Sequence, residues 1–139
     1  MTDEMLREIF KETKVIAVVG FSANPARPSH YVAAYLQAKG YRVIPVNPGL
    51  AGQSALGETV YPDLAAIPAG IAVDMIDIFR APEAVPGVVA EALSALPALK
   101  TVWMQLGVIS AEGAAMAQAA GKRVVMDRCP KMEMPRLGL

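Results

Sequence analysis

Cysteine and histidine each occur only once in this sequence, as Cys129 and His30. A single cysteine excludes an intramolecular disulfide and suits a protein that stays in the reducing cytoplasm. One cysteine and one histidine are also too few for the usual zinc site, which takes its ligands from several residues of these two kinds. We therefore expect a cytoplasmic protein without a metal site.

The sequence also lacks an excess of charge and a long apolar run. Its 13 basic residues balance 13 acidic ones, so no overall field would draw it to nucleic acid or to an anionic membrane. No apolar segment approaches the roughly 20 residues that span a bilayer, and residues 1–14 are too polar for a signal sequence. Nucleic acid and membranes are therefore not expected as partners.

What the sequence has in abundance is apolar side chains. Hydrophobic residues make up 54% of the 139 residues and charged residues 19%, which is enough to fill a core and too apolar for a disordered chain. A chain of this length has room for one such core. We expect residues 1–139 to form a single domain.

Short apolar segments alternate with segments of helical periodicity. Helices are predicted to begin at Ser29, Pro82 and Ser110. The alternation predicts right-handed βαβ units. The expected fold is therefore Rossmann-like α/β: a doubly wound, parallel five-stranded sheet in the order 3-2-1-4-5, with helices on both faces. The five predicted strands are residues 14–20, 41–46, 72–79, 101–104 and 123–126.

Three further segments lie outside this alternation. Residues 1–14 carry apolar side chains at helical spacing. Glycine and proline interrupt residues 50–68, which predicts a long loop with one helical turn near residues 63–67. Residues 131–139 indicate no particular element.

In an open parallel sheet, ligands bind beyond the carboxyl ends of the strands at the switch point, here expected between the first and fourth strands. The loop after the first predicted strand contains Gly20, Ser22 and Arg27 and leads into a helix. Free amides and the positive end of the helix dipole favour an anion such as a pyrophosphate, and a guanidinium can bind a phosphate through two nitrogens. The alternative is an ordinary turn from strand to helix.

This loop departs from the fingerprint of NAD-binding proteins. Phe21, Ser22 and Ala23 follow Gly20 where that fingerprint requires further glycines. At the end of the second predicted strand, Asn47 and Pro48 stand where an acidic residue would hold the ribose of NAD. These two residues could instead contact a ribose or an adenine, or form a simple turn.

Two more loops at the same edge carry groups suited to a nucleotide. Phe79 and Arg80 follow the third predicted strand, and they offer an aromatic face and a cation beside Asn47. Phe79 is equally compatible with a place in the core. Gln105 and Gly107 follow the fourth predicted strand, where an amide and an open backbone could hold an extended chain that contains amides. Their alternative is again a plain loop.

Six segments in this order closely resemble the small, stand-alone CoA-binding domain proteins of bacteria and archaea. The same domain begins the α subunit of succinyl-CoA synthetases and the ADP-forming acyl-CoA synthetases, where it binds CoA. The resemblance covers nearly the whole chain. The segments are residues 17–22, 27–28, 44–48, 77–80, 103–107 and 126–129.

The resemblance implies that coenzyme A is the cofactor, with its ADP moiety at residues 20–22 and Arg27. It also implies an adenine near Asn47, Pro48 and Phe79, a pantetheine chain that passes Gln105, and Arg80 as a partner for a phosphate. The expected coenzyme-binding residues are Gly20, Phe21, Ser22, Arg27, Asn47, Pro48, Phe79, Arg80, Gln105 and Gly107.

A reaction centre is not evident. The synthetases use a phosphorylated histidine in a further domain, whereas this chain has only His30, and no nucleophile, base and orienting group occur together. We therefore expect a protein that binds CoA or acyl-CoA without catalysis of its own, and leave enzymatic activity open. The alternatives are an NAD(P)-binding redox enzyme or sensor and an accessory subunit of a split acyl-CoA synthetase. A homo-oligomer or a ligase partner is compatible with these readings. Cys129 is expected as a packed, inert thiol or as one that forms a mixed disulfide with CoA.

Overall fold

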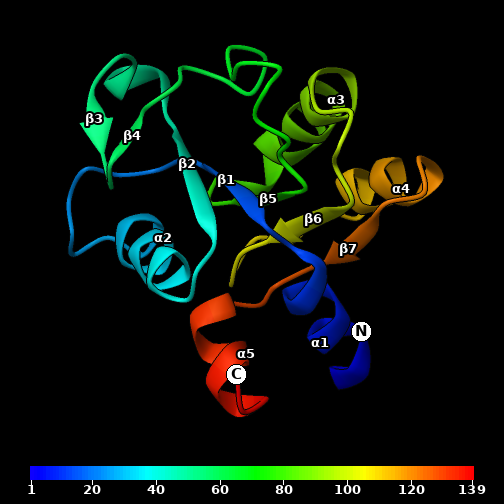
Figure 1. Ribbon diagram of the computed structural model, residues 1–139. Helices are drawn as coiled ribbons and strands as arrows, with labels where there is room; N and C mark the ends of the chain where they lie inside the picture. The colour runs from blue at the N-terminus through cyan, green and yellow to red at the C-terminus, as the bar shows by residue number, and fades with distance from the viewer.

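A five-stranded parallel sheet forms the centre of the computed structural model, which describes all of residues 1–139 (Figure 1). Every neighbouring pair of strands in this sheet is parallel. With helices on both faces, it is a Rossmann-like α/β fold, and the predicted fold class is confirmed. In the order in which they pair, the strands are β2 (Arg42–Val46), β1 (Val15–Val19), β5 (Met75–Ile78), β6 (Thr101–Met104) and β7 (Arg123–Val125).

The order of these strands corrects the prediction. The order 3-2-1-4-5 would place the third predicted strand outside the second, whereas β5 lies between β1 and β6, which makes the order 2-1-3-4-5 for these five strands. Pro45 in β2 explains the difference, because proline has no N–H for a ladder and belongs in an edge strand. All four residues of β5 are buried, as in a central strand. The switch point therefore lies between β1 and β5.

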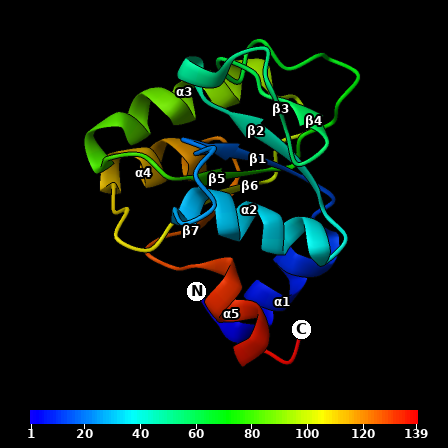
Figure 2. The ribbon, with the colours of Figure 1, turned by 90° about the vertical axis from the view of Figure 1, so that its left-hand side faces the viewer.

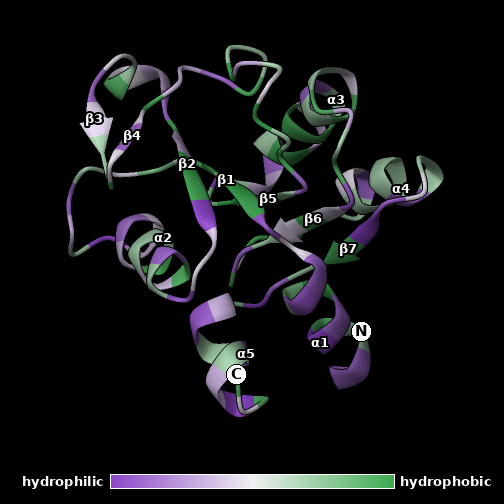
Figure 3. Ribbon diagram, in the orientation of Figure 1, coloured by the Kyte–Doolittle hydropathy of each residue, from purple (hydrophilic) through white to green (hydrophobic).

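Helices pack on both faces of the sheet, as Figures 1 and 2 show. None of them has the length and apolarity needed to cross a membrane. Figure 3 shows mostly hydrophilic residues along the first helix, because only one side of it faces the core. On one face lie α1 (Asp3–Glu12), α2 (Pro28–Ala38) and α5 (Pro130–Arg136); on the other lie α3 (Val85–Ala95) and α4 (Ala111–Ala119).

The predicted helix starts are accurate to within a few residues. The hydroxyl of Ser110 accepts a hydrogen bond from the Gly113 amide at 3.0 Å, so the predicted cap of α4 is confirmed. The start of α2 at Ser29 is wrong, because Pro28 already occupies the first turn, where its fixed φ suits a helix. A 3₁₀ helix, η2 (Pro82–Ala84), precedes α3. The last helix, α5, was not predicted, since its seven residues are too few to show a period.

The long connection from β2 to β5 contains more structure than its composition suggests. It begins with the 3₁₀ helix η1 (Pro48–Leu50) and continues into an antiparallel hairpin of β3 (Ser54–Ala55) and β4 (Glu58–Thr59). Positive φ angles at Leu56 and Gly57, 52° and 75°, form the two-residue turn that such hairpins favour. The prediction of a plain loop is therefore wrong for this hairpin.

The Gly20→Ala variant tests the turn after β1. Gly20 has a φ of +86°, and a Cβ there would overlap the carbonyl oxygen of Phe79. Gly40, with a φ of +101° and no neighbour at its Cβ position, serves as the matched control. We expect Gly40→Ala to cost about 1–2 kcal/mol of backbone strain and Gly20→Ala a further 1–3 kcal/mol, roughly, for the overlap. Urea unfolding measures the free energy of unfolding of both variants. Equal losses of stability would contradict the close approach of Gly20 to the Phe79 carbonyl.

Candidate functional site

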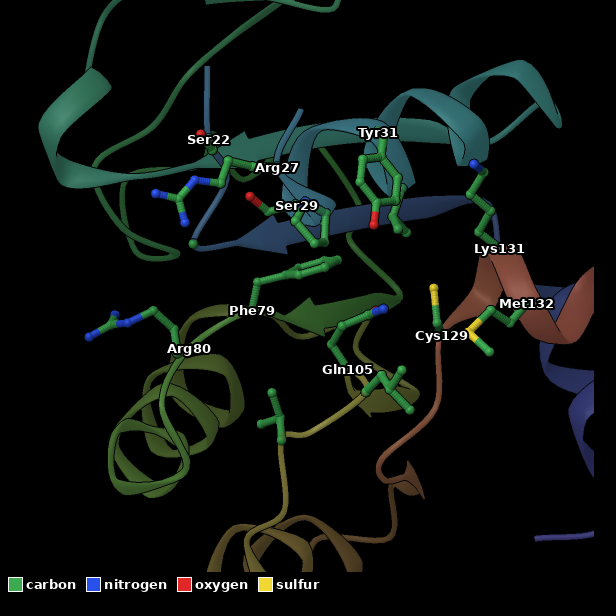
Figure 4. Close-up of a pocket in the computed structure, with 15 residues that line it drawn as sticks. Ser22, Arg27, Ser29, Tyr31, Phe79, Arg80, Gln105, Cys129, Lys131 and Met132 are labelled. Atoms are coloured by element: carbon green, nitrogen blue, oxygen red, sulfur yellow. The ribbon is translucent and has the colours of Figure 1, made fainter. Parts of the chain in front are cut away.

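A pocket of about 840 Å³ opens at the carboxyl edge of the sheet, over the switch point between β1 and β5 (Figure 4). Its volume lies within the range of small-molecule sites, roughly 300–1,000 Å³. Its walls come from the loop between β1 and α2, from α2 itself, from the segments that follow β5 and β6, and from the start of α5. Segments far apart in the sequence thus build one site.

The loop between β1 and α2 presents a free hydroxyl proton to the pocket. Ser22 Oγ accepts a hydrogen bond from the Asn24 amide at 3.1 Å, which leaves its own proton available to a ligand. The carbonyl of Ser22 lies 2.8 Å from His30 Nδ1. Because a carbonyl only accepts, Nδ1 of His30 carries the proton and donates it. His30 therefore braces this loop and does not line the pocket.

The first turn of α2 faces the same space. Arg27 occupies the N-cap position, and its side chain makes no capping hydrogen bond. Pro28 has no N–H, and the amides of His30 and Tyr31 donate to the Arg27 carbonyl. The Ser29 amide is therefore the free donor of this turn. An anion bound here would accept a hydrogen bond from that amide and would be stabilised by the positive end of the helix dipole.

Two guanidinium groups stand at the same end of the pocket. Figure 4 shows Arg27 and Arg80 on facing walls, and both are exposed. Neither forms an ion pair, since the ion pairs of the molecule all involve other arginines. Unpaired guanidinium groups are suited to bind phosphate through two nitrogens. The chemistry of this end of the pocket therefore suits an anion.

The floor of the pocket combines an aromatic ring with an unsatisfied amide. Phe79 follows β5 and is half-buried, with its ring under the pocket (Figure 4). Gln105 follows β6 and is only 5% exposed, and its Oε1 has no hydrogen-bond partner. Buried polar atoms are nearly always paired in proteins. The Oε1 atom is itself buried, whereas Figure 4 shows the side-chain nitrogen of Gln105 pointing into the pocket, where it can donate a hydrogen bond to a ligand.

A buried carboxyl lies beneath this floor. Asp77 is fully buried in β5, pairs in register with Val18 and Trp103, and has no hydrogen-bond partner on either oxygen. Residues two apart in a strand face the same side, so Asp77 lies one step below Phe79. Desolvation raises the pKa of Asp77 well above its usual value. The carboxyl under the pocket is therefore held toward its neutral form.

The end of the pocket opposite the arginines is formed by α2 and α5. The ammonium of Lys131 lies 5.0 Å from the centre of the Tyr31 ring, which joins the two helices across the pocket. Cys129 and Met132 line the same end (Figure 4). Glu133 holds α5 in place, since it pairs with Arg128 at 2.6 Å and also with Arg136.

The structure brings six of the ten predicted site residues to the pocket and places the other four elsewhere. Phe21 is fully buried in the core beneath α2. The side chain of Asn47 donates to the Phe21 carbonyl at 2.6 Å and accepts from the Gly49 amide, while Pro48 begins η1 outside the pocket. The amide of Gly107 donates to Asp127. The six that line the pocket are Gly20, Ser22, Arg27, Phe79, Arg80 and Gln105.

Sequence reasoning missed the wall formed by α5. Cys129 was expected only as a thiol that packs or pairs with CoA, and not as part of a wall. It and Lys131 follow the last strand directly, so the rule that ligands bind beyond the carboxyl ends of strands was the available signal. No signal in the sequence indicated α5, the helix that carries Met132. The residues that were not predicted for the pocket are Pro28, Ser29, Tyr31, Val32, Leu106, Val108, Cys129, Lys131 and Met132.

Known proteins are similar to this chain in sequence and in fold. Residues 14–135 match the family described as CoA binding domain. The uncharacterized protein YneT of Bacillus subtilis (strain 168) is 38% identical over 127 residues, which are 91% of this chain and 90% of that protein. A solved structure from Thermus thermophilus, cell-free ID.343, has 39% identity and a TM-score of 0.91, and covers 99% of both chains.

A more distant structure shares the fold. The apo form of the dinucleotide-forming acetyl-coenzyme A synthetase 1 of Ca. Korarchaeum cryptofilum is 23% identical and has a TM-score of 0.68. The match covers 88% of this chain but 28% of the synthetase chain. This chain therefore resembles one part of a larger enzyme.

A doubly wound sheet with an anion site at its switch point is typical of domains that bind nucleotides or nucleotide-containing coenzymes. Within that class, the matches over most of the chain show that this protein belongs to the CoA binding domain family. The resemblance seen in the sequence is confirmed.

The Asp77→Asn variant tests the buried carboxyl. Because the pKa of Asp77 is raised on folding, its contribution to stability is fully present below the unfolded pKa, about 4, and is lost as pH rises toward the folded value. The free energy of unfolding should therefore fall with pH by at most about 1.4 kcal/mol per unit in the wild type relative to the variant. Urea unfolding between acid and neutral pH measures this difference. Parallel profiles would contradict it.

Proposed function

We propose that this protein binds coenzyme A or an acyl-CoA in the pocket between α2, β5, β6 and α5, without catalysing a reaction of its own. One observation carries the proposal: the two unpaired guanidinium groups of Arg27 and Arg80 flank an uncapped helix N-terminus at one end of the pocket. The chain that forms this pocket belongs to a CoA-binding family. An ADP moiety supplies the phosphates that such an end requires.

The phosphates lie at the arginine end in this proposal. The pyrophosphate accepts hydrogen bonds from the Ser29 amide and from the Ser22 hydroxyl, and it binds Arg27 or Arg80. Gly20 permits the turn that leads to this end, because a Cβ there would overlap the Phe79 carbonyl. The adenine then lies outward, toward the exposed ring of Pro48, and Asn47 contributes by holding the loop rather than by touching the base.

The pantetheine chain lies along the floor. It is an extended chain with two amide groups, and the side-chain nitrogen of Gln105, which points into the pocket, can donate a hydrogen bond to one of their carbonyl groups. Phe79 supplies an apolar surface beside it. The chain then runs toward Cys129 and the apolar side chains of Leu106 and Met132, where a thiol or an acyl group would be placed.

Binding without catalysis is supported by what lines the pocket. None of its 15 lining residues is a histidine, an aspartate or a glutamate, the commonest general bases, and no base forms a hydrogen bond with the side chain of Cys129, Tyr31 or Lys131. Asp77 lies beneath the floor and is fully buried, out of reach of a bound ligand.

Calorimetric titration of ligand-free protein tests the proposal. CoA and acetyl-CoA should bind with a stoichiometry of about one per chain, as expected for one pocket. NADPH, which also carries a phosphorylated ADP moiety, is the matched control for the nucleotide part and should bind more weakly. Binding of NADPH in preference to CoA would favour a redox protein and overturn the proposal, as would the absence of any binding.

The Arg27→Ala variant tests the anion end. We expect CoA affinity to fall about 10- to 100-fold at low salt, because a hydrogen bond to a charged group contributes roughly 1.5–3 kcal/mol. The deficit should shrink as salt is raised, because Arg27 is exposed and its charge is screened. Arg7→Ala is the control, since Arg7 is an exposed arginine on α1 away from this pocket. Unchanged affinity at low salt would remove Arg27 from the site.

A further inference from the structure

The only cysteine of the protein opens into the pocket. Cys129 is 7% exposed, and Figure 4 shows its sulfur pointing from the start of α5 into the cavity. The turn that carries it is held from two sides: Trp103 Nε1 donates to the Arg128 carbonyl at 2.8 Å, and Asp127 Oδ1 accepts from the Gly107 amide at 2.7 Å. The thiol therefore has a defined position at the end opposite the arginines.

A second and independent feature indicates what lies next to this thiol. Gln105 is 95% buried and has no hydrogen-bond partner on its side-chain oxygen, and Figure 4 shows its side-chain nitrogen pointing into the same pocket toward Cys129. The amide carbonyls of pantetheine are acceptors for such an N–H group, and the thiol of CoA lies at the end of that same chain, beyond the amides. A CoA molecule that pairs with Gln105 and leaves its phosphates at Arg27 therefore brings its sulfur toward Cys129.

We propose that Cys129 forms a mixed disulfide with the thiol of coenzyme A held in this pocket. This inference rests on the proposed function, because the nucleotide delivers the sulfur. The oxidising partner is CoA disulfide, the oxidised dimer of coenzyme A. One half of the dimer occupies the pocket, and the other half extends through its mouth past Leu106 and Met132, which are 55% and 61% exposed.

The exchange balances without any other oxidant. The Cys129 thiol gives up its proton, and the resulting thiolate attacks the sulfur of the bound half. A bond between the two sulfurs forms as the original disulfide breaks, and the second CoA leaves as a thiolate that takes up a proton. One disulfide replaces another. Reduced CoA reverses the reaction by the same path.

The surroundings of Cys129 suit a thiol that reacts with one selected partner. No carboxylate lines the pocket to repel the attacking or departing sulfur. Because Cys129 is almost completely buried, a small disulfide that lacks the nucleotide has no binding energy to bring it into the cavity. We expect selectivity for CoA disulfide over glutathione disulfide.

Intact-protein mass spectrometry tests this proposal. Reduced protein incubated with CoA disulfide should gain the mass of one CoA less two hydrogens, and dithiothreitol should remove it. Since Cys129 is the only cysteine, this mass change locates the bond. Cys129→Ser should give no adduct. Glutathione disulfide at the same concentration should react about tenfold more slowly or worse, because access limits thiol exchange.

Two further measurements separate this proposal from the proposed function. Arg27→Ala keeps Cys129 but weakens the anion end, so its adduct with CoA disulfide should form more slowly while its reaction with glutathione disulfide stays unchanged. Titration of reduced CoA into wild-type protein reports binding alone. If CoA binds and no adduct forms, the mixed disulfide is overturned and the proposed function stands. If both disulfides react equally fast, Cys129 is a generally reactive thiol, and the proposal that the bound nucleotide delivers the sulfur is overturned. If CoA does not bind, both fail.

Discussion

The close approach of Gly20 to the backbone of Phe79 is the constraint on which the site depends. β1 and β5 pair side by side, and at their ends the chain must leave β1 without colliding with the carbonyl of Phe79. A glycine with a positive φ makes this turn possible. The turn sends the chain across to α2 and leaves the crevice between the two strands open. The pocket is the space that this turn creates.

The charges in the pocket are arranged along its length. The arginine end gathers the helix dipole and two unpaired guanidinium groups, while the other end is formed by apolar side chains, one thiol, and Lys131 against the Tyr31 ring. A ligand with phosphates at one end and a sulfur at the other suits the two guanidinium groups and the thiol. Desolvation raises the pKa of Asp77 beneath the floor, which disfavours a negative charge near the arginine end. The arrangement therefore favours binding in one orientation.

Much of the fold could be predicted from local patterns, because buried strands and capped helices leave their marks in neighbouring residues. The five strands and the cap at Ser110 are of this kind. The strand order could not be predicted in the same way, since it depends on which strand can lie at the edge of the sheet. Pro45 indicates that β2 is an edge strand, but the sequence does not show which strand pairs with β2 on its other side. Short elements such as β3 and α5 have too few residues to show a period.

The site was predictable where the chemistry lies in the loops after strands. Arg27, Arg80 and Gln105 fall in such loops, and the structure brings them together. Asn47 and Gly107 fall in similar loops but are used for hydrogen bonds between loops, a choice set by distances that the sequence does not contain. The wall from α5 was missed because it arises only when the last helix folds back beside α2.

The central claim is that a CoA molecule lies in the pocket with its phosphates at the start of α2 and its sulfur at the start of α5. A crystal structure of the protein with CoA tests it most directly. The account predicts the pyrophosphate within hydrogen-bond distance of the Ser29 amide and of Arg27 or Arg80, and the sulfur beside Cys129. A pyrophosphate beside Lys131, or a coenzyme bound outside the pocket, would contradict it.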